Sequence, residues 1–352
     1  MNNIIPIQKR ITAVLLVACC LISLVSFTPP SMAATHGPIL IDGNHQFNAP
    51  NGVVSGAGTE GNPFIIKNWV INASAGNGIE VRNANVYFVI RNCTIIGSAN
   101  FSGISFYNVK NGAIEGCSIS GGSRGIDLDQ SQFNTITGSN VSGNAQFGIR
   151  IWNSPNNTMT GNNVSGNSIC GIGIDFSSST VVSNNTVSDN GEYGINIDSS
   201  ANNTLTANSL TDSDVGIFLG FYTSNTLTNN SVSQCNHGIY AFASENRITG
   251  GSISGNAYGI YLKNAPWNII SNCSITGNTV YGIFYEPSEE PTFVANAEYC
   301  WWGSPDGPSG AGPGSGDAVS TRVDFDPWLT APWGYTQEYL VVIESSSGGT
   351  TN

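Results

Sequence analysis

The chain has 352 residues and a formal net charge of −12, and only 10% of its residues are charged. Soluble domains usually carry about 25% charged residues, so we expect an acidic surface rich in uncharged polar groups. Nucleic acids and anionic membranes bind clustered Lys and Arg, which this composition does not supply. The composition therefore argues against both partners and suits an extracellular protein.

The first residues have the features of an export signal. Lys9 and Arg10 precede an apolar run over 11–25, and small residues at 31–33 offer a cleavage site. A membrane-spanning helix needs about 20 apolar residues, more than this run supplies. We therefore predict a signal peptide over 1–33, no transmembrane span after its cleavage, and a secreted, cell-surface or periplasmic protein. Lipidation of Cys19, in a Leu-Val-Ala-Cys box, is the alternative.

The dipeptide Gly-Ile recurs at nearly constant spacing through the middle of the chain. Its ten copies begin at Gly78, Gly103, Gly125, Gly148, Gly171, Gly194, Gly216, Gly238, Gly259 and Gly282. Intervals of 21 to 25 residues between successive copies identify a structural repeat.

The chemistry within each repeat decides what kind of repeat it is. Apolar and polar residues alternate over short runs, and Asn, Ser, Gly and Asp interrupt them, as in the coil that begins at Gly194. This alternation is typical of strands, and Asn, Gly, Ser and Thr are poor helix formers. Short strands that return every 22–23 residues must pair in parallel with the coil before. We therefore predict an all-β parallel β-helix, a solenoid of about ten coils.

Stacked coils place equivalent residues in columns. The Ile of each Gly-Ile pair is expected to form an apolar ladder inside the solenoid. A second, polar ladder is predicted at Asn134, Asn157, Asn203, Asn225, Asn246 and Asn268, with Thr180 in the gap. Amide side chains in such a column can bond to each other and to the turn backbone. We give both ladders a structural role.

Cysteine and histidine residues do not suggest a metal site. Six cysteines follow residue 33, none of them in a CxxC pair, and His36, His45 and His237 are the only histidines. Cys93 and Cys117 fall at equivalent positions of adjacent coils, near enough for a disulfide. Because in-register parallel geometry disfavours that bond, we expect a free buried pair.

An open solenoid leaves a hydrophobic surface at each end, which atypical terminal segments must cover. We expect an N-terminal cap and first coil over 34–77, the β-helix repeats over 78–299 and a Trp-rich C-terminal cap over 300–330. Trp301, Trp302 and Trp328 would supply the apolar area of that second cap. Residues 331–352 are expected to form a linker and flexible tail, of the kind that leads to another module in a longer relative. A further module or a surface protein is a candidate partner.

Both ends carry distinctive motifs. They include Ile39-Leu40-Ile41-Asp42-Gly43, Asn62-Pro63-Phe64-Ile65-Ile66, Cys300-Trp301-Trp302-Gly303 and Val323-Asp324-Phe325-Asp326-Pro327-Trp328. With its coils, the chain resembles the NosD-like family of right-handed β-helix proteins, which share pectate-lyase-type repeats. The resemblance implies a right-handed solenoid and an exported location. It says little about activity, because this fold hosts lyases, hydrolases, epimerases, adhesins and binding proteins.

Aromatic residues gather in the later coils, on positions expected to face outward beside the Ile ladder. The candidate carbohydrate-binding residues are Trp152, Phe218, Tyr240, Phe242, Tyr261 and Phe284. Flat C–H faces of sugars can pack on such rings, and contiguous exposed rings usually mark an interaction site. Contact with a partner protein, or simple filling of strand positions, are the alternatives.

Charged residues gather in the earlier coils. Candidate catalytic residues are Asp129, Arg150, Asp175 and Asp198, and a Ca²⁺ ion is a possible cofactor at Asp127, Asp129, Asp175 and Asp198. Asp175 and Asp198 occupy one column on adjacent coils, so their carboxyl groups could work as an acid–base pair or bind Ca²⁺. A solvated acidic stripe that keeps the protein soluble is the third interpretation.

Three functional hypotheses follow. The first is a non-enzymatic exported protein that binds polysaccharide or a surface glycan. The second is a polysaccharide lyase or glycoside hydrolase that uses the outward carboxylates. The third, suggested only by the family resemblance, is an accessory protein for metalloenzyme maturation, although soft or imidazole ligands for copper do not cluster in the sequence.

Overall fold

The computed structural model describes residues 34–221, 224–287 and 294–332. The predicted signal peptide, with Cys19, and nearly all of the predicted tail lie outside the described residues. Within the described part of the chain, no helix has the length and apolar character needed to cross a membrane.

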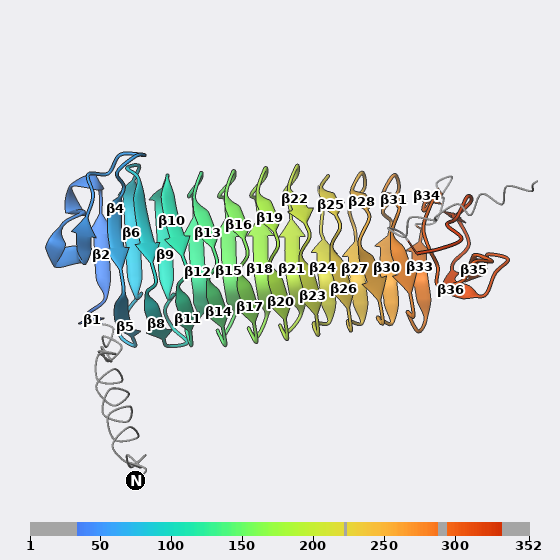
Figure 1. Ribbon diagram of the computed structural model, residues 1–352, viewed down its shortest axis with the longest axis horizontal. Coiled ribbons are helices and arrows are strands. Elements are labelled where there is room, and N and C mark those ends of the chain that lie inside the picture. Colours follow the sequence, from blue (N-terminus) through green and yellow to red (C-terminus); the bar gives the residue numbers. More distant parts are fainter. Residues whose placement is uncertain (1–33, 222–223, 288–293, 333–352) are drawn as a thin grey trace, which may run out of the picture. The chain divides into compact units, whose positions relative to one another are not determined.

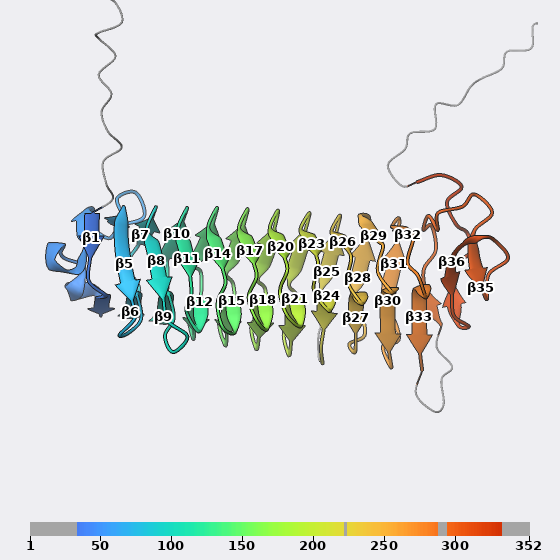
Figure 2. The ribbon, with the colours of Figure 1, turned by 90° about the horizontal axis from the view of Figure 1, so that it is seen from below.

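Three sheets, named A, B and C, make up the described unit. From β2 to β37 the strands pair in parallel, apart from the antiparallel pair of β3 and β4. Successive coils lie side by side from β6 to β33, and each coil up to β32 adds one strand to each sheet (Figure 1, Figure 2). The predicted right-handed parallel β-helix is therefore confirmed.

Sheet B carries the Gly-Ile repeats on most of its strands. In spatial order it consists of β2 (Ile39–Asp42), β6 (Ile79–Ala84), β9 (Ile104–Val109), β12 (Arg124–Asp129), β15 (Phe147–Trp152), β18 (Cys170–Asp175), β21 (Tyr193–Asp198), β24 (Val215–Leu219), β27 (His237–Ala241), β30 (Tyr258–Lys263), β33 (Tyr281–Glu286), β36 (Gly316–Val319) and β35 (Pro308–Gly310).

Sheets A and C complete each coil with shorter strands. Sheet A consists of β1 (Ala34–His36), β5 (Trp69–Ala73), β8 (Thr94–Gly97), β11 (Ser118–Ser120), β14 (Asn140–Ser142), β17 (Asn163–Ser165), β20 (Thr186–Ser188), β23 (Ser209–Thr211), β26 (Ser231–Ser233), β29 (Ser252–Ser254) and β32 (Ser274–Thr276). Sheet C consists of β3 (Val53–Ser55), β4 (Phe64–Lys67), β7 (Phe88–Arg91), β10 (Gly112–Glu115), β13 (Thr135–Thr137), β16 (Thr158–Thr160), β19 (Val181–Ser183), β22 (Thr204–Thr206), β25 (Thr226–Thr228), β28 (Arg247–Thr249), β31 (Ile269–Ser271), β34 (Ala295–Asn296) and β37 (Val323–Asp324). Two short 3-10 helices, η1 (Asn44–Gln46) and η2 (Ala49–Asn51), lie near the N-terminal end.

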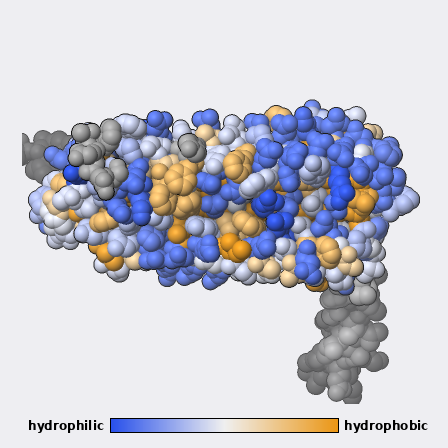
Figure 3. All heavy atoms as spheres, turned by 180° about the vertical axis from the view of Figure 1, so that it is seen from behind, coloured by the Kyte–Doolittle hydropathy of each residue, from blue (hydrophilic) through white to orange (hydrophobic). Residues whose placement is uncertain are grey.

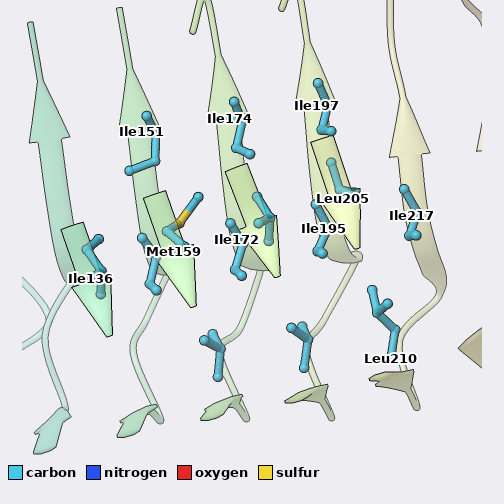
Figure 4. Packing of buried hydrophobic residues seen from close by; sticks show 14 of the residues in the cluster. Ile136, Ile151, Met159, Ile172, Ile174, Ile195, Ile197, Leu205, Leu210 and Ile217 are labelled. Atoms are coloured by element: carbon cyan, nitrogen blue, oxygen red, sulfur yellow. The ribbon is translucent and has the colours of Figure 1, made fainter. Parts of the chain in front are cut away.

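The core is a stack of apolar columns, one or two from each sheet. In sheet B, Ile149 pairs with Ile172 and Ile172 with Ile195, and all three side chains are fully buried. Figure 4 shows Ile172 and Ile195 of this column in the core, together with Met159 and Leu205 of sheet C and Leu210 of sheet A. Because each coil buries its apolar side only against its neighbours and the opposite sheets, the ladder also fixes the register of the residues that point outward.

Polar ladders fill the turns between the sheets. The predicted asparagine column is confirmed: the Asn134 backbone N–H donates to Asn157 Oδ1 at 2.8 Å, and Asn203 and Asn225 repeat the bond at 2.8 Å. A second column that the sequence analysis did not identify runs through Asn162 and Asn185 to Asn208 and Asn230. Each buried amide satisfies a backbone group of the coil before it, which matters because an unpaired buried N–H is costly.

Cysteines extend this second column at both ends. Cys117 donates its backbone N–H to Ser139, which in turn donates to Asn162. Cys93 and Cys117 are buried free thiols, as predicted, and contact between the two groups raises the pKa of Cys117. Cys273 and Cys300 form an equivalent pair in the last coils, where the same contact raises the pKa of Cys273.

The C-terminal segment covers the last coil with one tryptophan and one carboxylate. Trp302 is fully buried against the core, whereas Trp301 and Trp328 are only partly buried. Asp317 accepts hydrogen bonds from the backbone N–H groups of Gly277 and Asn278 at 2.8 Å and from the Asn278 amide at 2.7 Å. The carboxylate thus replaces the asparagine that the next coil would have supplied.

Candidate functional site

The outward face of sheet B displays three side-chain columns in each coil. They are formed by the residue before each Gly-Ile glycine, the residue after the isoleucine and the residue two positions further on. In β27 the first two of these are His237 and Tyr240, and Phe242 follows the strand. Strand pairing stacks Phe218, Tyr240 and Tyr261 directly over one another. Side chains distant in sequence therefore become neighbours on one surface.

Nine partly exposed rings form a continuous cluster in the C-terminal half of this face, and the more exposed Phe221 adjoins it, 5.6 Å from Phe242. We call it the aromatic patch, and it consists of Tyr193, Phe218, His237, Tyr240, Phe242, Tyr258, Tyr261, Tyr281 and Phe284. Centroid distances are 5.7 Å for Phe218–Tyr240 and 5.0 Å for Tyr240–Tyr261. All nine side chains are partly exposed. Figure 3 shows hydrophobic atoms gathered on this half of the face, among hydrophilic surroundings.

The structure brings five of the six predicted carbohydrate-binding residues together in this patch. The sixth, Trp152, lies apart, three coils before Phe218, and packs edge-on against Phe176 at 4.9 Å. Sequence reasoning missed the column formed by the residue before each Gly-Ile glycine, which supplies Tyr193, His237, Tyr258 and Tyr281. Its signal was available, because each of these residues directly precedes a Gly-Ile glycine.

His237 is part of the patch rather than an isolated side chain. Its ring stacks between Tyr240 at 5.1 Å and Tyr258 at 5.2 Å. Burial among these rings lowers the pKa of His237, because the charged imidazolium is harder to solvate there. This shift favours the neutral imidazole, which adds a flat face with a polar edge.

The charged groups at the C-terminal end of the patch neutralise one another. Tyr261 donates a hydrogen bond to the Glu286 carboxylate, and Lys263 Nζ lies 3.7 Å from the same carboxylate. Burial and the bond to Glu286 raise the pKa of Tyr261, so the phenol stays protonated. Beyond them, Tyr281 and Phe284 line a cavity of about 520 Å³ against the C-terminal segment.

The predicted charged residues sit in the central coils of the same face. Asp127 is buried and lies between two guanidinium groups, 3.3 Å from Arg124 Nη1 and 3.0 Å from Arg150 Nη1. The Arg150 guanidinium also lies over the Trp152 ring, 4.8 Å from its centroid. Arg150 is thus engaged on both sides, by an ion pair and by a cation–π contact.

Three of the predicted carboxylates fall in one column with Trp152. Asp129 pairs with Trp152, Trp152 with Asp175, and Asp175 with Asp198, which places the last two on adjacent strands as predicted. The Asn196 amide donates to Asp175 at 3.1 Å, and the Phe221 backbone N–H donates to Asp198 at 2.9 Å. Burial, followed by the nearby Asp198 charge, raises the pKa of Asp175 to about 6.

This raised pKa predicts a pH-dependent effect on stability. The folded state holds the Asp175 proton more tightly than the unfolded state, so this contribution is complete below about pH 4 and is lost as the pH rises through about 6. Asp175→Asn should therefore raise the free energy of unfolding near pH 7.5 but leave it nearly unchanged near pH 4, in urea titrations at both values. Asp189→Asn makes the same substitution at an exposed site and is the control. A gain for Asp175→Asn that did not depend on pH would contradict the ionisation argument.

The N-terminal coils of the face form a polar cleft of about 380 Å³. Its walls include Asp42, Arg82 and Tyr107, together with the predicted residues Asp127 and Asp129. Arg82 lies against Glu80 in an ion pair. The face therefore runs from a charged cleft, through the Arg150–Trp152 contact, to the aromatic patch.

The calcium and catalytic assignments stay predictions. Across the described ranges, no three His, Cys, Asp or Glu side chains converge as metal ligands would. Asp127 is committed to Arg124 and Arg150, and Asp198 accepts a backbone hydrogen bond, so Asp129 and Asp175 are the carboxylates with the fewest strong partners.

A comparison with protein families identifies the chain. The family model described as "Periplasmic copper-binding protein (NosD)" matches residues 55–250 and 222–297, which together span more than half of the chain. The chain belongs to the NosD family. The resemblance seen in the sequence is thereby confirmed, and the family description is that of a periplasmic protein. No curated protein matches this NosD-family chain.

Solved structures share the fold at low sequence identity. The A-module of mannuronan C-5 epimerase AlgE6 from Azotobacter vinelandii aligns with a TM-score of 0.62 and 16% identity, over 76% of this chain and 83% of that chain. The AlgE4 A-module from the same organism gives 0.58 and 17%, over 78% and 86%. The tailspike protein gp49 of Pseudomonas phage LKA1 gives 0.50 and 12%, over 67% and 47%. The NosD-family solenoid is thus a fold that polysaccharide-acting enzymes also use.

The described residues do not form a site that fits the copper named in the family description. Copper prefers thiolate, thioether or imidazole ligands. His237 lies within the aromatic patch. Contact with the neighbouring cysteine, followed by burial, raises the pKa values of Cys117 and Cys273 and opposes their thiolate forms, whereas contact with Cys117 lowers the pKa of Cys93. The role in metalloenzyme maturation therefore stays an untested hypothesis.

Proposed function

We propose that this NosD-family protein is exported and binds an extracellular polysaccharide along the outward face of sheet B, without catalysing a reaction. The observation that carries the proposal is the aromatic patch: nine partly exposed rings in mutual contact on an open face of parallel strands. Within the patch, successive coils place rings at equivalent positions, which suits a polymer of repeating units.

The composition of the patch favours a sugar over an apolar protein surface. Six of its nine rings belong to tyrosine or histidine and three to phenylalanine, so apolar ring faces lie beside polar ring edges. Sugar rings have the same character, because their C–H faces are apolar and their hydroxyl groups point outward. The cavity beside Tyr281 and Phe284 would receive a further sugar unit at the end of the patch.

A binding assay with a matched aromatic control tests the proposal. Wild-type protein is applied to an array of immobilised extracellular polysaccharides, and Tyr240→Ala and Phe133→Ala are then titrated against the polymers that bind. Tyr240 contacts four other rings of the patch, so its loss should weaken binding about tenfold or more, which corresponds to about 1.4 kcal/mol. Phe133 is 54% exposed on a turn outside the patch, and its loss should change affinity less than about twofold.

Two further measurements are needed to interpret the binding assay. Tyr240→Phe keeps the ring and should retain most of the affinity, because stacking on the ring face is the main contact. Thermal unfolding of each variant checks that the solenoid is intact. The proposal fails if no polysaccharide binds, or if Tyr240→Ala and Phe133→Ala weaken binding equally.

A further inference from the structure

Every cationic side chain on the strands of sheet B is paired with a carboxylate. These strands hold four Arg or Lys residues in the described part of the chain: Arg82, Arg124, Arg150 and Lys263. Arg82 pairs with Glu80, Arg124 and Arg150 share Asp127, and Lys263 pairs with Glu286. These four cations are therefore neutralised by ion pairs within the face and are not free to pair with a ligand.

Carboxylates remain in excess on the same strands. Eight are present against the four cations: Asp42, Glu80, Asp127, Asp129, Asp175, Asp198, Glu286 and Asp317. Asp129, Asp175 and Asp198 take part in none of the ion pairs formed by the described residues. They lie in a single outward column, with Trp152 between Asp129 and Asp175. The face that would hold a polysaccharide thus carries net negative charge, as does the whole chain.

We infer that the polysaccharide recognised by this face is uncharged, and that uronate or sulfated polymers are excluded. This inference rests on the proposed function and names its substrate class. A polyanion lying on the aromatic patch would extend past Asp175 and Asp198 without meeting a free cation, so it would gain no ion pair and meet like-charge repulsion. A neutral polymer stacks on the same rings without this cost, and the carboxylates can accept hydrogen bonds from its hydroxyl groups.

The location of the charges separates a neutral polymer from a cationic one. The three unpaired carboxylates of the column lie on β12, β18 and β21, whereas all the rings of the aromatic patch except Tyr193 lie from β24 onward. A polymer of protonated amino sugars would therefore bind mainly through the carboxylate column. Its binding would be screened by salt and would depend little on Tyr240.

Affinity electrophoresis of the whole protein tests the inference with three probes: a neutral hexose polymer, polygalacturonate and a polymer of glucosamine. We expect retardation by the neutral polymer that changes less than about twofold between about 50 mM and 500 mM salt, and that Tyr240→Ala weakens about tenfold. Tighter binding of polygalacturonate, or of the glucosamine polymer with loss in high salt, would overturn the inference while leaving the proposed function in place. Binding of none of the polymers would overturn both.

A charge-release variant provides a second, positive test. Glu286→Gln preserves the shape of the side chain but frees Lys263 beside the aromatic patch. If the pairing of this cation excludes uronates, the variant should bind polygalacturonate at least about threefold more tightly than wild type at low salt. The control is Glu115→Gln, which makes the same charge change and frees Arg91 on sheet C, away from the face. An equal gain in both variants, or none in Glu286→Gln, would contradict the inference.

Discussion

Gly171→Ala is expected to destabilise the solenoid by about 3 kcal/mol, although it adds a single methyl group. A Cβ atom at this position would lie 2.6 Å from the carbonyl oxygen of Gly194 and 2.7 Å from Val187 Cγ1. The carbonyl belongs to the backbone of the next coil and cannot move away without breaking the pairing of β18 with β21. The same close approach recurs along the Gly-Ile column: a Cβ atom added at Gly194, for example, would lie 2.6 Å from the carbonyl oxygen of Gly216.

Urea unfolding followed by circular dichroism measures this effect. Gly76→Ala is the matched control, because no atom lies within 4 Å of the Cβ that it would add. It should leave stability unchanged or raise it slightly, since alanine restricts the unfolded chain. Equal stability of Gly171→Ala and wild type would mean that adjacent coils can separate locally to admit a Cβ atom. Steric exclusion would then not explain why glycine occupies this column.

Asn185→Ala should lower the free energy of unfolding by about 2–3 kcal/mol, because it removes an acceptor from a fully buried ladder. Asn185 Oδ1 accepts the backbone N–H of Asn162 at 2.9 Å and its side-chain amide at 3.0 Å. The Asn185 amide donates to the carbonyl of Met159 and to Asn208 Oδ1. The alanine would leave the Asn162 N–H buried without a partner, which is the main cost.

The chain itself suggests a partial rescue. Ser139 occupies the same column and accepts the Cys117 backbone N–H through its hydroxyl group at 3.2 Å. Asn185→Ser should therefore lose less stability than Asn185→Ala in the same urea titration. Asn163→Ala, on the exposed surface of β17, should change stability by less than about 0.5 kcal/mol. Equal losses in the alanine and serine variants would show that the ladder bond is not what stabilises the turn.

Both variants also bear on the proposed binding face. The aromatic patch exists only because every coil repeats in register over the previous one, and the glycine and asparagine columns maintain that register. A partly unstacked coil would separate rings that now lie about 5 Å apart, such as Tyr240 and Tyr261. Variants that keep their fold but shift the register should thus lose polysaccharide binding along with stability.

Local periodicity was enough to predict the fold and part of the candidate site. Ten Gly-Ile pairs at 21 to 25 residues, with alternating apolar residues, allow only a stacked parallel arrangement, and that stacking places Asp175 beside Asp198 and Phe218 beside Tyr240. One-dimensional repeats are favourable for such reasoning, because contacts between neighbouring coils occur at a constant sequence separation. The same constant separation also predicts the column that includes His237 and Tyr258, although the sequence analysis did not include that column.

The ion pairs, by contrast, were decided by the tertiary structure. Arg124 and Arg150 converge on Asp127 from different strands and different columns, and Lys263 reaches Glu286 rather than solvent. Long side chains choose among several neighbours by rotamer and burial, which a column assignment does not contain. The sequence therefore determined the backbone path and which residues face outward, because these depend on repeat spacing and alternation. Side-chain packing in three dimensions decided which charges form ion pairs within the face and which rings contact one another in the aromatic patch.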